Sequence, residues 1–432
     1  MLKAGFARCD ITPPLGAPMA GYFSKRNAKG ILDPLEANAV AVSSGEETLI
    51  FVAVDLLGMT RSYIDRIRAA IAERVGIPAG NIFLASLHQH TSCVLHDGRT
   101  ISYRDAAGLD VLLRRIADAA VMAVDDLRDA TGEVGERVLA EPIAFVRRYL
   151  AKDGSIHTNP RADVPLAGRC DEADNTVRLV RFRRTGAADI AILSFSTHPD
   201  VIGGEKFSAD WPGFARRYLE AAIPGTSCLF FTGVQGDSNH INYLVPPNER
   251  FRNGGRYGHA DYMGRTVADA AVAIWDSLSP IVGEEIFARE CTVYNRTNTE
   301  GAEDYDRYRA WYNEYEAGRI QTPHITELAY ASRIIRLRGA SIWQGVPLSL
   351  FGIGNLRFVG FGGEAFTAYG DAVRALLPGC FTLTSVCTNG YEGYLPTAKA
   401  FREGGYETAS SLFTPTLEQE ILDAFRGMIE NK

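Results

Sequence analysis

The stretch between residues 37 and 92 constrains the fold of this chain more than any other. Its first part, "ANAVAVSSGEETLIFVAVDLLGM", joins two apolar runs by Ser-Ser-Gly-Glu, a pattern that predicts a β-hairpin. The next part, "RSYIDRIRAAIAERVG", places apolar residues at helical spacing from Ile64 to Val75, with Gly76 as a stop signal. "NIFLASLHQHTS" then predicts a further strand. Strand, helix and strand in this order form a crossover unit, so a parallel strand pair and an α/β fold are expected.

Two histidines, His88 and His90, stand where the second strand of this unit ends. The chain has only 8 histidines in 432 residues, so a pair this close singles out this position. The carboxyl ends of parallel strands are where α/β sheets place their ligands. Residues two apart in an extended segment point to the same side, so we expect both rings to face one site. Metal binding, proton transfer and plain packing are all open for this pair.

The alternation of strands and helices continues along the chain. "NTVRLVRFRR" and "DIAILSFSTHPD" predict a second hairpin that again ends on a histidine, His198. "SCLFFTGVQGDSNHIN" predicts a strand that runs into a polar loop, and "NLRFVGFGGEAFTAYGDAVRAL" predicts a strand, a glycine turn with Glu364 and a helix. We expect one large α/β catalytic domain over residues 1–432, with central mixed β-sheets flanked by helices. Further helices are expected over 106–129, 211–223 and 259–278, further strands near 285–296 and 348–361, and a surface helix or lid over 298–323.

Composition and charge argue against several kinds of partner. The formal net charge is -7 and no Lys/Arg run stands out, so nucleic acid is not an expected partner. The 7 cysteines are scattered without a CxxC pair, which suggests neither a disulfide framework nor a thiolate zinc site. We see no apolar signal segment and no apolar run of membrane length, so we expect a cytoplasmic protein without stable membrane insertion. The oligomeric state stays open.

Polar clusters that each follow a hydrophobic strand indicate a metal site. Two or three histidines with one carboxylate suit a catalytic zinc, which keeps one position open for water. Each histidine taken alone is more often a hydrogen-bonded structural residue than a ligand. "GFGGEAF" does not meet the GxGxxG spacing of a dinucleotide loop, and neither GxSxG nor HExxH occurs.

Ordered sequence blocks between residues 4 and 415 resemble those of the neutral/alkaline ceramidase family. They are "AGFARCDITPPLGAPMAGY", "DLLGM", "SLHQHTS", "STHPDVIG", "SADWPG", "GVQGDSN", "GGEAFTAYG" and "NGYEGYLPTAKAFREGGYETASSLF". The first is similar to the family's "DITGP…MMGY" and the third to its "THTHS". The resemblance implies an α/β catalytic domain that holds one zinc and hydrolyses the amide bond of an N-acylsphingosine.

The resemblance also implies roles for individual residues. The zinc ligands would be His88, His198, Glu364 and Tyr394, the last as an unusual phenolate-type ligand. The implied catalytic residues are His90, Arg147, Asp237, Asn239 and Tyr406. His90 would contact substrate and not the metal, while Tyr406 and Arg147 would stabilise the oxyanion; Arg148 is the alternative to Arg147. Asp237 and Asn239 would orient His90 or the attacking water.

Some positions depart from the family pattern. Asn239 stands where the family has a serine with a catalytic part, and Ser238 lies one residue early. Leu32 stands where the family has a histidine. We also see no export signal and no room for the C-terminal immunoglobulin-like domain of full ceramidases. These departures predict weak or no action on long-chain ceramide.

Three functions are compatible with the sequence. The first is a zinc-dependent hydrolase that cleaves a carboxamide of a small-molecule or lipid-like N-acyl substrate with metal-activated water. The second is a metal-dependent esterase or phosphoesterase on the same scaffold, for which a second metal would find spare carboxylates at Asp10, Asp210 and Asp237. The third is a binding scaffold without catalysis, and the joint presence of four implied zinc ligands argues against it.

Overall fold

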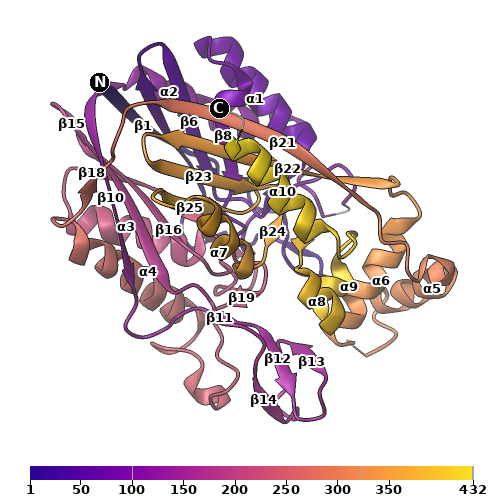
Figure 1. The fold of residues 1–432 in the computed structure, drawn as a ribbon. Helices are drawn as coiled ribbons and strands as arrows, with labels where there is room; N and C mark the ends of the chain where they lie inside the picture. The colour runs from indigo at the N-terminus through magenta and orange to yellow at the C-terminus, as the bar shows by residue number, and fades with distance from the viewer. Residues whose placement is uncertain (100, 322, 431–432) are drawn as a thin grey trace.

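A mixed sheet of nine strands forms the centre of the molecule (Figure 1). The computed structural model describes residues 1–99, 101–321 and 323–430. The strand order is β18-β16-β15-β10-β1-β5-β6-β8, with β20 paired to β10. Both ends of this order are parallel pairs, β6 with β8 and β16 with β18, and the pairs between them are antiparallel. The strands are β1 (Leu2–Asp10), β5 (Glu36–Ser44), β6 (Glu47–Val54), β8 (Ile82–Ser86), β10 (Arg128–Val138), β15 (Thr176–Arg184), β16 (Asp189–Phe195), β18 (Thr226–Thr232) and β20 (Ser279–Pro280).

The two edge strands of this sheet approach each other. Phe83 on β8 and Phe231 on β18 have their ring centroids 5.4 Å apart. Just beyond, the Thr232 hydroxyl donates to the Leu87 carbonyl at 2.9 Å. The sheet is therefore strongly curved, and the carboxyl ends of its two parallel pairs lie close together.

A second sheet packs against the first through aromatic side chains. Its order is β21-β22-β23-β25, and its last pair is again parallel. Phe358 of this sheet lies 4.3 Å from Phe51 of the first, centroid to centroid, and Phe351 lies 5.4 Å from Phe83. Full burial of one such ring contributes about 1.5–3 kcal/mol, so this cluster holds the two sheets together. The strands are β21 (Ile286–Arg296), β22 (Trp343–Ile353), β23 (Leu356–Phe361) and β25 (Phe381–Ser385).

Helices cover the outer faces of both sheets. α2 packs over β1, β5 and β6, and α1 packs against α2 and β8, with Ile67 and Ile116 in one buried apolar cluster. α3 and α4 pack against each other and over β15, β16 and β18, and α7 and α10 cover the second sheet. The helices are α1 (Arg61–Val75), α2 (Ala106–Asp125), α3 (Asp210–Ala222), α4 (Arg256–Ile274), α5 (Tyr305–Glu316), α6 (Ile325–Leu337), α7 (Thr367–Leu376), α8 (Ala398–Glu403), α9 (Tyr406–Ser410) and α10 (Leu417–Glu430).

Short strands within the loops between these elements pair with one another in small sheets of two or three strands. The hairpin of β12 and β13, with β14 on its other side, projects at the lower edge in Figure 1. These strands are β2 (Pro18–Met19), β3 (Arg26–Asn27), β4 (Gly30–Ile31), β7 (Gly58–Met59), β9 (Val94–Leu95), β11 (Phe145–Val146), β12 (Arg148–Ala151), β13 (Ile156–Thr158), β14 (Leu166–Arg169), β17 (Lys206–Phe207), β19 (Ser238–Asn239), β24 (Glu364–Ala365) and β26 (Tyr394–Leu395).

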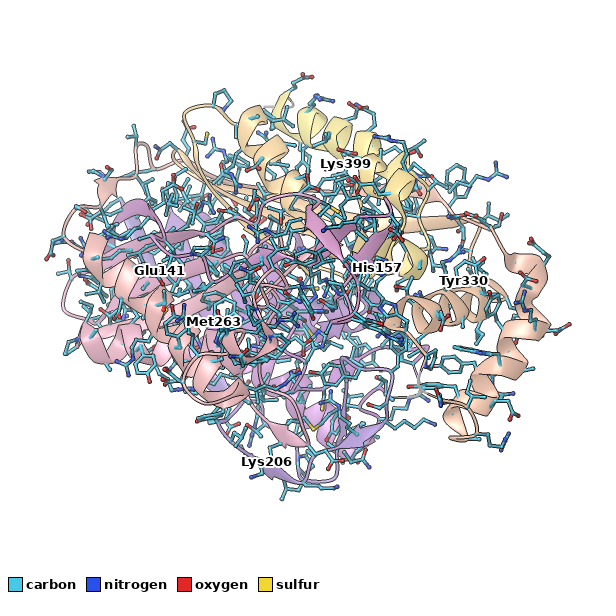
Figure 2. All side chains as sticks on the ribbon, turned by 90° about the horizontal axis from the view of Figure 1, so that it is seen from below. Glu141, His157, Lys206, Met263, Tyr330 and Lys399 are labelled. Carbon is cyan, nitrogen blue, oxygen red and sulfur yellow. The ribbon has the colours of Figure 1, made fainter. Side chains whose placement is uncertain are left out.

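The α5–α6 pair forms one flank of the molecule. Seen from below, it lies at the side with Tyr330 labelled on α6 (Figure 2). None of the α5 side chains is buried, as expected for a surface helix over 298–323. At its far end the Glu316 carboxylate pairs with Lys25 at 3.2 Å, so this flank reaches the loop that follows β2.

Most elements agree with the sequence-based expectations. The hairpin, α1 and its stop at Gly76 are confirmed; Gly76 has φ 70 and its N–H donates to the Ala72 carbonyl. The helix expected over 106–129 ends at Asp125, because the chain then enters β10, a strand that we did not predict. The strand expected over 348–361 is the end of β22 joined by a tight turn to β23.

None of the helices in the described ranges is both long enough and apolar enough to cross a membrane.

Candidate metal centre

Three parallel strand pairs supply the residues of one buried site. His88 follows β8, His198 follows β16, and Glu364 opens β24 shortly after β23. The carboxyl ends of these strands meet because the first sheet is curved and the second packs against it. His88 and His198 have ring centroids 5.3 Å apart, so the structure brings these two histidines together.

His88 is held in an uncommon backbone conformation. Its φ is 73, in the left-handed region, so β8 has ended before it and the expected extended strand through His90 is wrong. The Nδ1 atom lies 2.8 Å from the Leu57 carbonyl, which can only accept, so Nδ1 carries the proton. The lone pair on Nε2 is then directed inward, where the Glu364 carboxylate lies 3.3 Å away. This tautomer is the one that a metal ligand needs.

His198 has the same arrangement on the opposite side. Its Nδ1 atom donates to the carbonyls of Gln235 at 2.8 Å and Ser238 at 2.9 Å, and its Nε2 atom lies 3.2 Å from Glu364 Oε2. Burial, helped by the charge of Arg147, lowers the pKa of His198 to about 3. The ring is therefore neutral at physiological pH, with a free Nε2 lone pair.

Glu364 stands between the two histidines. Burial alone would raise the pKa of this carboxyl group, but His88 and His198 outweigh it and hold the pKa well below its usual range. The parallel pairing of β24 with β26 places Glu364 directly opposite Tyr394. A carboxylate and a phenol far apart in sequence are thus fixed side by side by backbone hydrogen bonding.

His90 completes a cluster of three imidazoles. Its ring centroid lies 5.1 Å from that of His88 and 5.8 Å from that of His198. Its Nδ1 atom lies 3.5 Å from Asp200 Oδ1, and the same Asp200 oxygen accepts a hydrogen bond from the Tyr22 hydroxyl. Burial, together with the neighbouring His88, lowers the pKa of His90 well below its ordinary value.

Arg147, Tyr394 and Tyr406 form the opposite wall. Arg147 Nη2 donates to the Tyr394 hydroxyl at 3.0 Å and to the Gly236 carbonyl at 2.9 Å, while its Nε atom donates to Glu407 at 2.8 Å. The rings of Tyr394 and Tyr406 lie 5.5 Å apart. Burial raises the pKa of Tyr406 to about 12 and raises the pKa of Tyr394 well above its ordinary value, although Arg147 opposes both shifts. Tyr394 therefore needs a strong positive charge beside it to become a phenolate.

The other predicted residues are engaged elsewhere. Arg148 donates to Gly404, Glu403 and Glu407 and has no hydrogen bond to Tyr394, so Arg147 is the arginine at this wall. Asp237 accepts from the Thr367 N–H and hydroxyl, both at 2.8 Å, at the start of α7. Asn239 binds Asn159 and the Ile241 N–H, both at 2.9 Å. Neither residue hydrogen-bonds His90, so the expectation that they orient His90 directly is wrong; a role in orienting water stays a prediction.

The donor groups of this site fit a divalent cation. The ligand nitrogens of His88, His90 and His198 all lie within 4.8 Å of one another. Within the described ranges, neither ring nitrogen of His90 has a hydrogen-bond partner, and buried polar atoms without partners are rare and costly. Neutral imidazoles with one carboxylate are the donor set that zinc prefers. The site therefore has the composition of a metal centre.

Comparison with known proteins gives matches of structure only. No model of a known family and no curated protein matches the sequence. The neutral ceramidase from Pseudomonas aeruginosa matches with a TM-score of 0.73 and 18% identity, covering 99% of this chain and 74% of that chain. A ceramidase complexed with C2 matches with a TM-score of 0.75 and 17% identity, with the same coverage. The chain has the fold of a neutral ceramidase. The resemblance seen in the sequence blocks is thus confirmed for the fold over nearly the whole chain.

The neutral ceramidase fold also places residues at the site that the sequence analysis missed. Asp200 and Tyr22 contact each other beside His90, and Tyr391 lies 5.7 Å from the His88 ring. Glu407 anchors Arg147. All four lie inside the resembling blocks, "STHPDVIG", "PMAGY" and "NGYEGY…GGYETASS", so their place in those blocks was the available signal.

Proposed function

We propose that this protein is a zinc-dependent hydrolase that cleaves the carboxamide of an N-acyl amine. The observation that carries the proposal is the buried group of His88, His198 and Glu364, bordered by His90 on one side and by Arg147 with two tyrosines on the other. The fold shared with neutral ceramidases supports the same chemistry.

Four residues would hold the metal. His88, His198 and Glu364 offer Nε2 and carboxylate atoms that already lie within 3.3 Å of each other in two pairs. Tyr394 is the fourth, placed beside Glu364 by the strand register. When bound, zinc supplies a Lewis acid that polarises a carbonyl and acidifies a water molecule.

Arg147 and Tyr406 would stabilise negative charge that develops on the carbonyl oxygen. The guanidinium is fixed by Glu407 and Gly236, so it needs little reorganisation during the reaction. The Tyr406 phenol keeps its proton, since its pKa is raised to about 12 by burial, and it can therefore donate a hydrogen bond. Loss of one such donor typically costs about 10²–10³ in rate.

His90 would handle the proton of the leaving amine. Its ring is neutral and its nitrogens have no hydrogen-bond partner within the described ranges, so one of them is available to substrate. The Tyr22 ring packs edge to face against His90 at 5.4 Å, centroid to centroid, and would limit the ring orientation, while Asp200 Oδ1 lies 3.5 Å from Nδ1.

A metal-dependent esterase or phosphoesterase is the alternative. Many phosphoesterases use two metals, and the three candidate carboxylates for a second ion have other partners. Asp10 accepts from the Thr12 N–H at 2.8 Å, Asp237 accepts from Thr367, and Asp210 accepts from the N–H groups of Val201, Ile202 and Trp211. This arrangement favours the one-metal hydrolase.

The deciding experiment combines metal content with a substrate panel. Elemental analysis of the purified chain should find one zinc per chain. The zinc-loaded protein should hydrolyse short, soluble N-acyl amines faster than matched carboxylic and phosphate esters. Two metals per chain with phosphate-ester turnover would favour the alternative, and a chain without metal or turnover would contradict both.

A further inference from the structure

A cavity lies between α5, α6 and α9, on the flank where Figure 2 labels Tyr330. Its volume is about 440 Å³, within the range of about 300–1,000 Å³ that is typical of small-molecule sites. Tyr308 and Trp311 line it from α5, Tyr330 lines it from α6 and Ala409 from α9. Three aromatic rings from two helices therefore border one space.

The aromatic side chains of α5 share one face of this helix. Residues three or four apart on a helix lie on the same face, and this spacing holds for Tyr305, Tyr308, Trp311 and Tyr315. The Tyr308 ring lies 5.2 Å from the Tyr330 ring of α6, centroid to centroid, so this face is turned toward α6. A helix face that packs on protein is normally buried, yet none of the α5 side chains is. Tyr308 and Trp311 instead keep ring surface open to the cavity.

The short helix α9 connects the cavity to the metal centre. Ala409 follows Tyr406 by three residues, and residues at this spacing lie on one helix face with Cβ atoms about 5–6 Å apart. The Tyr406 ring lies 5.5 Å from that of Tyr394, at the wall of the metal centre. α9 is held against α6 by Arg336, which donates to the Ser410 carbonyl at 2.6 Å. The cavity therefore begins about one helical turn from Tyr406, a distance that one end of a substrate can span.

The lining of the cavity suits a flat ring better than an alkyl chain. In the part of the chain that the structure describes, three of the lining side chains are aromatic, Ala409 is aliphatic, and Arg307 and Glu327 are charged. An alkyl chain would desolvate the two charged groups without offering them a hydrogen bond, which is unfavourable. An aromatic ring can stack on Trp311 or on the tyrosines and direct a polar substituent at its edge toward a charged group.

The polar groups of the lining can both donate and accept. Glu327, in the first turn of α6, accepts from the His324 N–H through Oε2 at 3.3 Å, which leaves Oε1 for a ligand. Arg307 has its Cζ atom 5.3 Å from the centroid of the Tyr308 ring and brings a guanidinium donor to the same cavity. A hydroxyl group on a bound ring could donate to Glu327 or accept from Arg307.

We propose that the cavity between α5, α6 and α9 binds an aromatic ring with a hydrogen-bonding substituent, a phenol being the simplest, at one end of the substrate. The inference rests on the proposed function, and it narrows the substrate class to N-acyl amines that carry an aryl group on the acyl or the amine side. Ceramide has two alkyl chains and no aromatic ring, so the natural substrate belongs to a different chemical class from ceramide.

The test uses matched substrates on the full, zinc-loaded chain. N-octanoyltyramine ends in a phenol, N-octanoylphenethylamine in a plain aromatic ring, and N-octanoylcyclohexylethylamine in a saturated ring of the same size. A second series places the same three rings on the acyl side, as hydroxyphenylpropanoyl, phenylpropanoyl and cyclohexylpropanoyl amides of octylamine. In one series we expect kcat/KM of the phenol compound to exceed that of the cyclohexyl compound by about threefold to tenfold, the usual worth of an aromatic pair beyond its buried area. The series with this preference identifies the side that enters the cavity.

Variants separate the cavity from the rest of the molecule. Trp311→Ala removes one wall and Ala409→Leu fills the space, so each should bring the phenol-to-cyclohexyl ratio of kcat/KM toward one, mainly through KM. The ratio matters because a change on α9 can shift Tyr406 and slow all substrates alike. Trp343→Ala is the matched control: it removes a tryptophan that is 54% exposed at the start of β22, outside the cavity lining, and should leave the ratio unchanged.

A binding measurement keeps this inference separate from the proposed function. Sulfonamide analogues of the phenol and cyclohexyl compounds are not hydrolysed, and calorimetry gives their affinities for the zinc-loaded chain. Tighter binding of the phenol analogue that is lost in Trp311→Ala and Ala409→Leu, but kept in Trp343→Ala, supports the cavity even where no amide is turned over. Equal affinities and equal kcat/KM for the phenol and cyclohexyl compounds, or a preference for cyclohexyl, would overturn the inference while leaving amide hydrolysis intact.

Discussion

Replacement of Glu407 by glutamine tests the ionic support behind the metal centre. The Glu407 side chain is 0% exposed and accepts from Arg147 Nε at 2.8 Å, Arg148 Nη1 at 3.3 Å and the Thr158 hydroxyl at 2.8 Å. Glutamine has the same shape but no charge, and it directs an NH₂ group at one of these donors. Arg147 would then be a buried cation without a carboxylate partner in the described ranges.

The expected cost follows from the burial of this cluster. Removal of one partner from a buried, hydrogen-bonded ion pair costs about 3–5 kcal/mol, because the remaining charge stays desolvated. The matched control is Glu403→Gln, since Glu403 is 24% exposed and pairs with the same Arg148 at 3.0 Å. Glu403 is partly exposed and Arg148 keeps its second partner Glu407, so this replacement should cost less, about 1 kcal/mol.

Urea unfolding at neutral pH measures both variants against the parent chain. For a chain of this size about 1 kcal/mol corresponds to about 1 °C in Tm, so thermal scans should show a drop of about 3–5 °C for Glu407→Gln and less for Glu403→Gln. Turnover of a soluble amide should also fall in Glu407→Gln, because Arg147 loses its anchor beside Tyr394. Equal and small effects of the two replacements would refute the reasoning that Glu407 holds Arg147 in place.

Three further outcomes are expected. His198→Ala should lose both zinc and turnover, whereas His90→Ala should keep zinc and lose turnover; equal zinc loss by elemental analysis would make His90 a ligand. Detergent-dispersed long-chain ceramide should be turned over more slowly than soluble N-acyl amines, and the reverse ranking of kcat/KM would restore ceramide as the substrate. The folded chain keeps His259 neutral because burial lowers its pKa to about 4, while the unfolded chain takes up that proton near pH 6.5. The free energy of unfolding should therefore fall as the pH drops from about 6.5 to 4, and less steeply in His259→Asn; identical slopes in urea titrations would contradict this.

The periodic parts of the fold could be predicted from the sequence. The hairpin of β5 and β6, α1 with its glycine stop, and the hairpin of β15 and β16 all have local signals that the structure follows. β10 has no apolar pattern typical of a strand, because "RDATGEVGERV" is mostly polar and much of it faces solvent. It forms a strand because it pairs with β1 and β15. Tertiary pairing of this kind outweighs local propensity.

Local sequence patterns predicted only those site residues that follow strands, because the other contacts at the site depend on the tertiary fold. Strand ends indicated His88, His198 and Glu364, and the curvature of the first sheet brings them together. The predicted extended backbone at His88 was wrong. An apolar run in the sequence does not show that the residue after β8 adopts the left-handed conformation. Asp200 and Tyr22 were missed because they are 178 residues apart and only the tertiary fold makes them a pair.

The register that sets Glu364 opposite Tyr394 has a consequence for how this protein is made. Both residues lie near the end of the chain, 166 or more residues after His198. At about 5–20 residues per second, the histidines leave the ribosome on the order of ten seconds or more before the carboxylate and the phenol. A nascent chain would therefore carry imidazoles without their acidic partners and could hold zinc only weakly. If the chain binds zinc as proposed, the complete ligand set exists only once Glu364 and Tyr394 have been made, so we expect metal capture to follow synthesis of both acidic ligands.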